Sequence, residues 1–356
     1  MKRAIQLASR ARGMTSPNPM VGALLVKNGR VVTEDYHRKA GTPHAEALAI
    51  EKAGVKAASS TLYVSLEPCC HTDKRTPPCT KAIIRAGIKR VIVAMRDPNP
   101  KVSGKGIKEL EAAGIEVVTG VLEEEARRLN EAYIKYIRTK KPFVVLKVAM
   151  TLDGKIATQE GQSKWITGEK SRHMVHRLRS GVDAVMTAIG TVKADDPQLT
   201  ARIRGGRDPR RIVIDPELQI PLNSRILRVP PETIIVAKET GHPDPERTAK
   251  INYIESLGGS ILFFKGQLEL NWLMERLGEM QITSLMIEGG SSLNAHALED
   301  GIVDKVLFFI APKIIGGRES YPSVGGKTSR SLESAYRLKD ITVRRLGEDI
   351  LLSGYL

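Results

Sequence analysis

The sequence is poor in cysteine, in aromatic residues and in long apolar runs. Its three cysteines fall within eleven positions, between Cys69 and Cys79, which favours a metal site in a reducing compartment over a disulfide framework. No apolar run reaches the roughly 18–20 residues that span a bilayer, and the N-terminus turns polar before a signal-peptide core could form. We therefore expect a cytoplasmic protein that has no membrane partner.

Aromatic residues make up 4% of the chain, so its cores should be aliphatic. The length of 356 residues exceeds the about 250–300 residues at which a single core stops growing, which indicates two domains. The charge-laced helical stretch 122–136 is typical of a linker, and the turn 139–142 ends it. We expect one domain over 1–140 and a second over 141–356.

Acidic residues are too few to balance the basic ones, and the net charge of +15 is carried mostly by the first 140 residues. A basic domain is compatible with nucleic acid, with phosphorylated small molecules or with a solvated surface. The basic residues are not accompanied by the aromatic residues that stack on single-stranded nucleic acid. Charge alone leaves the partner open.

One stretch carries recognisable chemistry. His44 and Glu46 are followed by Cys69 and Cys79, each of which comes directly after a proline. One imidazole and two thiolates form a three-ligand zinc set that leaves the fourth position for water. Glu46 is too close to His44 to be an easy fourth ligand and is well placed to carry protons. This pattern indicates a zinc-dependent nucleobase deaminase, whereas buried cysteines without a metal are the alternative.

The first domain reads as alternating strands and helices. We expect helices over 1–12, 45–52, 78–86 and 106–113, and strands over 21–26, 31–36, 61–66, 90–95 and 115–118. The Asn28-Gly29 dipeptide predicts a hairpin between the first two strands. The alternation implies a largely parallel α/β sheet with the site at its edge.

In the second domain we expect strands over 143–150, 184–188, 284–287 and 305–310, and mostly strands and turns after residue 303. A helix should begin at Gly168, be capped by Thr167 and continue through Arg179. The glycine turn at Gly289-Gly290 precedes another helix and suits a phosphate, or is a plain helix start. The Gly-x-Gly-x-x-Gly fingerprint is absent, so a Rossmann domain is not supported.

Short motifs in both halves, in the same order, resemble those of the bifunctional pyrimidine deaminase/reductase family of riboflavin biosynthesis. In the first half they are Ser16-Pro17-Asn18-Pro19, His44-Ala45-Glu46, Leu66-Glu67-Pro68-Cys69, Arg75-Thr76-Pro77-Pro78-Cys79 and Arg96-Asp97-Pro98-Asn99-Pro100. In the second half they are Leu152-Asp153-Gly154-Lys155, Ser163-Lys164-Trp165-Ile166-Thr167, the stretch 190–197, Ile287-Glu288-Gly289-Gly290 and Ala311-Pro312-Lys313. The resemblance covers nearly the whole chain.

The resemblance implies an N-terminal cytidine-deaminase-like three-layer α/β sandwich and a C-terminal domain similar to dihydrofolate reductase. The first would use Zn²⁺ to deaminate a phosphoribosylated diaminopyrimidinone, and the second would use NADPH to reduce the ribosylamino chain to ribitylamino. The partners would be this small phosphorylated pyrimidine and further copies of the chain, as a dimer or tetramer, without nucleic acid.

The resemblance also implies roles for individual residues. Zinc would be held by His44, Cys69 and Cys79, with Glu46 as the proton shuttle. The deaminase substrate would contact Asn18 and His37, and its phosphate Arg75. NADPH would contact Ala149, Trp165, Thr191, Asp195, Gly290, Ser291 and Ser292. The substrate of the reductase would contact Ser163, Arg179, Leu199, Arg202 and Glu288.

The sequence departs from the family pattern at two points. The family has eight residues between its ligand cysteines, and nine separate Cys69 from Cys79, so either the loop is one residue longer or Cys70 is the ligand. We favour Cys69, because it keeps its distance from the preceding strand. Glu34-Asp35 replaces a glycine turn before His37, which affects where that histidine lies.

Two other functions share part of the pattern. A nucleic-acid editing deaminase would need a stacking surface and would leave the second half unexplained. A zinc scaffold without catalysis would need a fourth protein ligand, for which His71 is the candidate.

Overall fold

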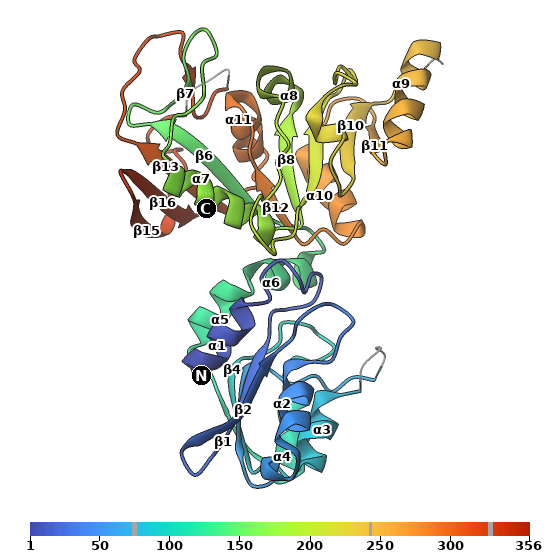
Figure 1. Cartoon of the computed structure of the whole chain (residues 1–356), viewed down its shortest axis with the longest axis vertical. Helices are drawn as coiled ribbons and strands as arrows, with labels where there is room; N and C mark the ends of the chain where they lie inside the picture. The colour runs from blue at the N-terminus through green and yellow to red at the C-terminus, as the bar shows by residue number, and fades with distance from the viewer. Residues whose placement is uncertain (73–76, 242–243, 327–329) are drawn as a thin grey trace. The chain divides into compact units, whose positions relative to one another are not determined.

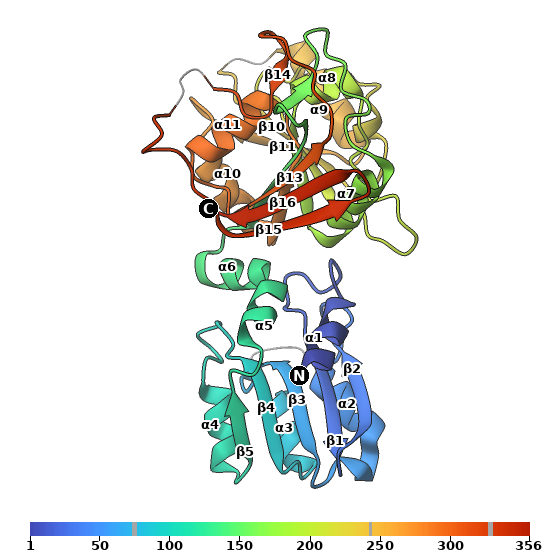
Figure 2. The ribbon, with the colours of Figure 1, turned by 90° about the vertical axis from the view of Figure 1, so that its left-hand side faces the viewer.

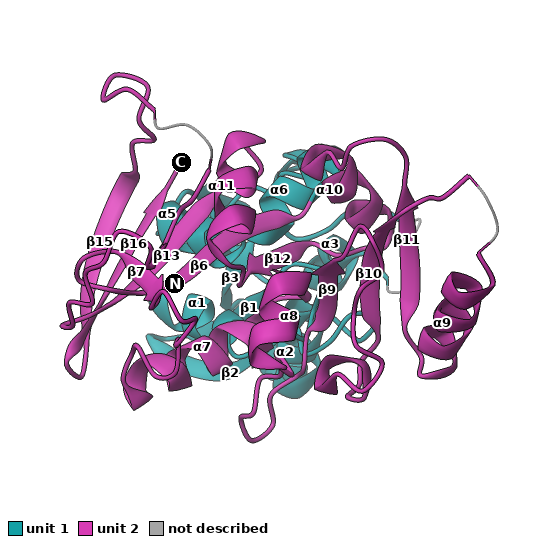
Figure 3. Cartoon of the chain, turned by 90° about the horizontal axis from the view of Figure 1, so that it is seen from above, with its two compact units in different colours: residues 1–141 teal, residues 142–356 magenta. Residues whose placement is uncertain are grey.

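The computed structural model describes residues 1–72, 77–241, 244–326 and 330–356 (Figure 1). It divides into two compact units, Met1–Lys141 and Pro142–Leu356, which are coloured separately in Figure 3. Among the residues described, no helix is long and apolar enough to cross a membrane.

Unit 1 (Met1–Lys141) is an α/β sandwich with the strand order β2-β1-β3-β4-β5. Helices α1 and α5 pack on one face of the sheet, and α2, α3 and α4 cover the other (Figure 2). The elements are α1 (Lys2–Ser9), β1 (Gly22–Lys27), β2 (Arg30–Tyr36), α2 (Ala45–Ala53), η1 (Gly54–Ala57), β3 (Thr61–Leu66), α3 (Cys79–Arg85), β4 (Arg90–Met95), α4 (Lys105–Ala112), β5 (Glu116–Thr119), α5 (Glu123–Leu129) and α6 (Glu131–Thr139).

The expected hairpin is present between β1 and β2, and both of its turn residues have positive φ, 51° at Asn28 and 72° at Gly29. The prediction of a largely parallel sheet is wrong for the β2-β1-β3 part. Strand β1 pairs antiparallel with β2 and with β3, whereas β3, β4 and β5 run parallel. The hairpin reverses β2 against β1, and the α2 crossover then returns β3 parallel to β2 on the other side of β1.

The helical stretch predicted over 122–136 is divided at Asn130 into α5 and α6. The Asn130 side chain pairs with the backbone of Met20: Met20 N donates to Oδ1 at 2.8 Å, and Nδ2 donates to Met20 O at 3.0 Å. Asparagine side chains that bind backbone groups in this way compete with helix continuation. The loop before β1 is thereby tied to the α5–α6 junction.

Unit 2 (Pro142–Leu356) is built on a sheet with the order β11-β10-β9-β8-β12-β6-β13-β16-β15. The strands from β11 to β13 run parallel, and β16 and β15 continue the sheet antiparallel. The elements are β6 (Phe143–Thr151), β7 (Lys155–Ala157), α7 (Glu169–Gly181), β8 (Ala184–Ala188), α8 (Ile189–Asp195), β9 (Arg210–Ile214), η2 (Arg225–Leu227), β10 (Thr233–Lys238), α9 (Pro245–Ser256), β11 (Ser260–Phe264), α10 (Leu270–Glu279), β12 (Ser284–Ile287), α11 (Ser291–Glu299), β13 (Lys305–Ala311), β14 (Tyr321–Pro322), β15 (Lys339–Leu346) and β16 (Asp349–Tyr355).

Helices cover both faces of this sheet, and successive strand residues alternate between two aliphatic cores. On β8, Met186 packs in the core that α10 and α11 close, and Val185 packs in the core that α8 and α9 close. Figure 3 shows α10 and α11 on one side of the strands and α7 and α8 on the other. Because the parallel strands share a direction, the loops that follow β6, β8 and β12 emerge at the same edge.

The prediction that Thr167 caps the helix containing Arg179 is wrong. Gly168 is the N-cap of α7, not Thr167. The carboxylate of Asp349, at the start of β16, accepts hydrogen bonds from Gly168 N at 2.8 Å and from the Ser171 hydroxyl at 2.5 Å. A residue that is distant in sequence therefore accepts the hydrogen bonds that the groups at the start of α7 donate.

Candidate functional site

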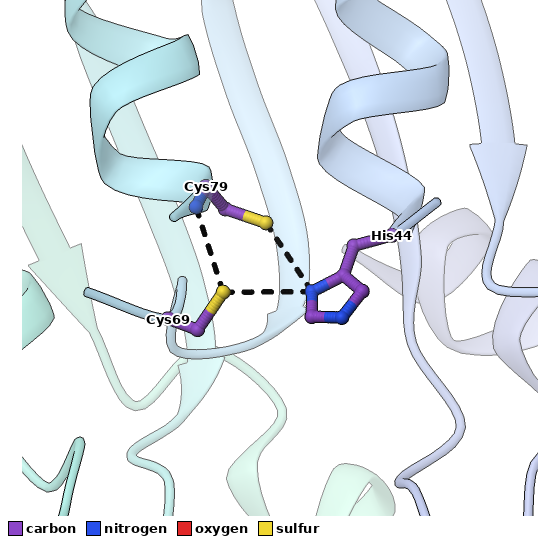
Figure 4. A group of neighbouring side chains, drawn as sticks. All are labelled: His44, Cys69 and Cys79. Carbon is purple, nitrogen blue, oxygen red and sulfur yellow. Dashed lines mark hydrogen bonds between the residues drawn. The ribbon is translucent and has the colours of Figure 1, made fainter. Parts of the chain in front are cut away.

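Three metal-ligand atoms meet in unit 1 (Figure 4). His44 is the N-cap of α2, Cys79 is the first residue of α3, and Cys69 lies in the loop after β3. His44 Nδ1 is 3.5 Å from Cys69 Sγ and 3.3 Å from Cys79 Sγ. All three donor atoms lie within 4.8 Å of one another. The strand-to-helix connections thus bring together residues that are up to 35 positions apart.

The donor set and its spacing fit zinc. A tetrahedral ion with Zn–S bonds of about 2.3 Å and Zn–N bonds of about 2.0–2.1 Å separates nitrogen from sulfur by about 3.6 Å. The observed separations of 3.5 and 3.3 Å are close to this value. Cys79 lies at a helix N-terminus, where the positive end of the dipole stabilises a thiolate.

Cys69, rather than Cys70, belongs to this group of donor atoms. Burial raises the pKa of the Cys70 thiol, which disfavours the thiolate that a metal requires. His71, the fourth ligand that a zinc scaffold would need, is not part of the group. The ligand set therefore leaves room for a water or a substrate atom.

Glu46 lies in the first turn of α2, two residues after His44, and is 3% exposed. Burial raises the pKa of its carboxyl, and the carboxylate interacts electrostatically with His44 and Cys69. Its Oε2 atom is buried and has no hydrogen-bond partner among the residues that the structure describes. A buried carboxylate oxygen in this state calls for a bound water or ligand, and it is the observation that makes the zinc-and-water interpretation fit.

Asn18 and His37 lie beside the same centre. His37 Nε2 is 3.4 Å from Asn18 Nδ2, and the His37 and His44 rings meet edge to face with centroids 5.2 Å apart. His37 is 2% exposed, and burial lowers its pKa, which favours the neutral imidazole. Arg75 and its neighbour Lys74 lie outside the described residues.

In unit 2, a buried ion cluster lies where β12 ends, beside the middle of β6. Glu288, directly after β12, binds Arg179 of α7 through Nε–Oε1 at 2.6 Å and Nη2–Oε2 at 3.0 Å. Lys147 of β6 donates to Glu288 Oε2 at 3.2 Å. Burial acts to raise the pKa of Glu288, but Arg179 and Lys147 outweigh burial and lower this pKa to about 2. The cluster therefore keeps a carboxylate ionised.

The loop after α8 joins this cluster. Arg179 Nη1 donates to Thr200 O at 3.1 Å, and Arg202 Nε donates to Thr200 Oγ1 at 3.2 Å. Leu199 and Arg202 have positive φ values of 54° and 51°, a conformation that non-glycine residues adopt where the surrounding structure enforces it. Burial, together with Arg179, lowers the pKa of Arg202. Four of the predicted substrate contacts, Glu288, Arg179, Leu199 and Arg202, thus lie around one loop.

The fifth predicted contact, Ser163, donates to Asp195 Oδ1 at 3.2 Å, and Lys164 pairs with the same oxygen at 3.2 Å. Trp165 follows and is 63% exposed, with the Arg172 guanidinium 4.7 Å from its ring centroid. An exposed indole offers a surface on which a flat ring can stack.

The other predicted NADPH contacts lie at the same strand ends. Gly290 is the N-cap of α11, and a Cβ placed on it would be 3.8 Å from Thr191 Oγ1 of α8. Ser291 and Ser292 open α11, and Ser291 Oγ is buried without a partner in the described part of the chain. Ala149 lies two residues after Lys147 on β6 and so faces the same side.

Three residues of these sites were not predicted: Glu67, Asn130 and Thr200. Glu67 and Asn130 are 2% exposed, and Thr200 is 8% exposed. A signal existed for the first two, since Glu67 ends an apolar strand before a proline and Asn130 interrupts a helical charge pattern. Nothing in the sequence singles out Thr200, whose role depends on tertiary contacts.

In comparisons with known proteins, each unit matches a protein family. Residues 1–95 match the family described as the cytidine and deoxycytidylate deaminase zinc-binding region, and residues 142–352 match the RibD C-terminal domain. The riboflavin biosynthesis protein RibD of Aquifex aeolicus is 46% identical over 354 residues, which cover 99% of this chain and 96% of that protein. RibD of Escherichia coli is 39% identical over 369 residues, with 99% and 97% covered.

Solved structures agree with these matches. The diaminohydroxyphosphoribosylaminopyrimidine deaminase/5-amino-6-(5-phosphoribosylamino)uracil reductase of Thermotoga maritima superposes with a TM-score of 0.88 at 38% identity, covering 100% of this chain and 97% of that one. RibD of Acinetobacter baumannii gives 0.87 at 37% identity, covering 99% and 97%. The predicted cytidine-deaminase-like and dihydrofolate-reductase-like folds are confirmed. Because relatives match both halves in order and at full length, the chain belongs to the RibD family of bifunctional deaminase/reductase enzymes of riboflavin biosynthesis, and not to the editing deaminases or zinc scaffolds.

Proposed function

We propose that the chain deaminates 2,5-diamino-6-(5-phosphoribosylamino)pyrimidin-4(3H)-one and then reduces the ribosylamino side chain of the product to ribitylamino with NADPH. The name of the Thermotoga maritima relative supports this pair of substrates. The observation that carries the proposal is the convergence of His44, Cys69 and Cys79 beside the buried Oε2 of Glu46.

In the deaminase unit, His44, Cys69 and Cys79 would hold zinc, which when bound supplies a Lewis acid that makes water nucleophilic at neutral pH. Glu46 accepts a proton of the attacking water at Oε2 and returns it to the amino group, which leaves as ammonia. Its burial suits this exchange, because burial raises its pKa toward the pH at which it must both accept and release a proton.

Asn18 and His37, which lie beside the centre, orient the pyrimidine. The Asn18 amide offers both a donor and an acceptor to a ring carbonyl and ring N–H. Neutral His37, 3.4 Å from that amide, limits its orientation. Arg75 contacts the substrate phosphate in this proposal.

In the reductase unit, NADPH when bound would supply the hydride for reduction at C1′ of the ring-opened sugar. The residues that would bind the cofactor are Trp165, Thr191, Asp195, Ala149 and the turn residues Gly290, Ser291 and Ser292. The unpartnered Ser291 Oγ at the start of α11 supports a phosphate there.

The substrate of the reductase lies over the ion cluster. Arg179 and Arg202 bring positive charge that a substrate phosphate complements, and Glu288 and Ser163 accept and donate hydrogen bonds to the pyrimidine or the sugar. Lys147, held by Glu288, adds a third cation to this cluster. The protein needs positioning and polarising groups here, because the cofactor carries the redox chemistry.

The test is a coupled assay on the purified full chain with zinc, the diaminopyrimidine phosphate and NADPH. We expect ammonia release followed by loss of the nicotinamide absorbance in equal amounts. Ammonia without NADPH oxidation would contradict the reductase half, and neither signal from zinc-loaded protein would contradict the substrate assignment.

A further inference from the structure

Glu67 is a buried carboxylate that the chemistry proposed above does not use. It lies between the end of β3 and Cys69 and is 2% exposed. Its Oε2 accepts hydrogen bonds from Asp97 N at 3.1 Å and Gly104 N at 3.0 Å, and its Oε1 accepts one from Ile107 N at 3.2 Å. All three donors belong to the segment that connects β4 to the first turn of α4. One side chain thus fastens the β3 end to the β4–α4 connection.

The β4–α4 connection also contacts the zinc ligands. Val102 is 1% exposed and packs with Cys69 and Cys79 in a small buried cluster. Gly106 approaches the peptide before Cys69 so closely that a Cβ on it would lie 2.1 Å from Pro68 O. The position of the Pro68–Cys69 peptide therefore depends on where this connection lies.

The connection has an anchor of its own at its other end. Tyr133 of α6 donates to Asp97 Oδ1 at 2.8 Å, and Asn99 N donates to the same oxygen at 2.9 Å. Gly104, the N-cap of α4, has a φ of 78° and no side chain with which to cap the helix. Glu67 takes over that function from outside the helix, since its two oxygens bind the N–H groups of the N-cap and of the third helical residue.

We propose that Glu67 is a positioning residue for the zinc ligand Cys69. Its carboxylate locks the Glu67–Cys69 turn onto the β4–α4 connection, so that Cys69 Sγ is held at ligand distance from His44 before metal arrives. The proposal rests on the proposed zinc function. A carboxylate is required because both oxygens must accept, and an amide would direct its NH₂ group at backbone donors.

The test compares Glu67→Gln with wild type in the full chain, by following zinc release to a chromogenic chelator. Loss of groups that orient metal ligands typically costs about 10–100-fold in metal affinity, so we expect zinc to leave about 10–100-fold faster. Ammonia release should fall with zinc content and recover in excess zinc at an unchanged KM. Reductase activity, which belongs to unit 2, should not change.

The control is Ile115→Ala, which removes a buried side chain just before β5, at the end of the sheet opposite to Cys69. It should lower the thermal midpoint and leave zinc release at the wild-type rate. Equal acceleration in this variant, or wild-type release in Glu67→Gln, would overturn the proposal.

Gly106→Ala supplies a second variant should Glu67→Gln fail to fold. Glu67 stays intact, but the new methyl group pushes on the Pro68 carbonyl, so zinc release should again accelerate, and an unchanged rate would overturn the proposal. Absence of zinc binding in the wild type would instead overturn the proposed zinc function.

Discussion

Arg179 binds Glu288 through two parallel hydrogen bonds, with 2.6 Å between Nε and Oε1 and 3.0 Å between Nη2 and Oε2. The two side chains are 12% and 7% exposed. Only a planar guanidinium can bind a carboxylate in this two-pronged way. The pair joins α7 to the turn after β12, and so fixes the carboxylate around which we propose that the reductase site is built.

Arg179→Lys should therefore impair reduction although it preserves the charge. A lysine makes at most one of the two hydrogen bonds, and we expect unit 2 to lose about 2 kcal/mol of unfolding free energy and the KM for the deaminated pyrimidine to rise. Denaturant unfolding and steady-state NADPH oxidation measure these effects. Arg177→Lys, an exposed neighbour on the same helix, is the matched control and should behave as wild type.

Acid should remove the contribution of Glu288 to the unfolding free energy of unit 2. Its pKa is lowered in the folded chain from 4.5 to about 2, so the ionised carboxylate stabilises unit 2 above about pH 4.5. That contribution is lost as the pH falls from 4.5 through 2, and it amounts to on the order of 3 kcal/mol. The gap in unfolding free energy between wild type and Glu288→Gln should narrow between pH 6 and pH 3. A constant gap would mean that Glu288 titrates normally.

Cys69 and Cys70 provide a direct test of the ligand set. Cys69→Ser should lose bound zinc and ammonia release, because a hydroxyl is a poor replacement for a thiolate, whereas Cys70→Ser should keep both. Metal analysis of the purified variants measures the first effect. Chelator treatment of the wild type should likewise stop ammonia release, leave reduction intact and be reversed by added zinc. If Cys69→Ser retained zinc and Cys70→Ser lost it, Cys70 rather than Cys69 would be the zinc ligand.

Asn130 should influence the deaminase from outside its site. Asn130→Ala leaves the backbone N–H and C=O of Met20 without their partners, which costs about 1–3 kcal/mol in unit 1. The loop that carries Asn18 should loosen, so the KM for the diaminopyrimidine should rise while reduction continues unchanged. Asn252→Ala, at an exposed position of α9, is the control. An unaltered KM in Asn130→Ala would show that the Met20 contact does not hold Asn18.

Local patterns predict the elements that lie nearest the zinc centre. Strands β3, β4 and β8 span the predicted residues, because each is a short apolar run between turn residues. The three ligand residues could also be predicted, since His-x-Glu and the two Pro-Cys pairs are local in sequence. The sequence left Cys69 and Cys70 as alternatives and favoured Cys69, because of its distance from the preceding strand, and Cys69 is the thiol that lies beside His44.

The remaining differences come from contacts between distant residues. From the sequence we predict no element between residues 198 and 283, where β9, β10, α9, β11 and α10 lie. Strand β9, for example, begins with two arginines, and buried Arg211 is accommodated by the carbonyls of Pro209, Val229 and Pro231. The α7 cap depends on Asp349, 181 residues away. No local rule anticipates partners of this kind.

Glu46→Gln gives the most direct test of two chemistries in one chain. With the diaminopyrimidine phosphate and NADPH, zinc-loaded Glu46→Gln should release ammonia at least about 10²-fold more slowly than wild type and therefore leave NADPH unoxidised. Supplied with the already deaminated pyrimidine, it should oxidise NADPH at the wild-type rate. Ammonia release near the wild-type rate, or loss of both activities while zinc stays bound, would contradict the account.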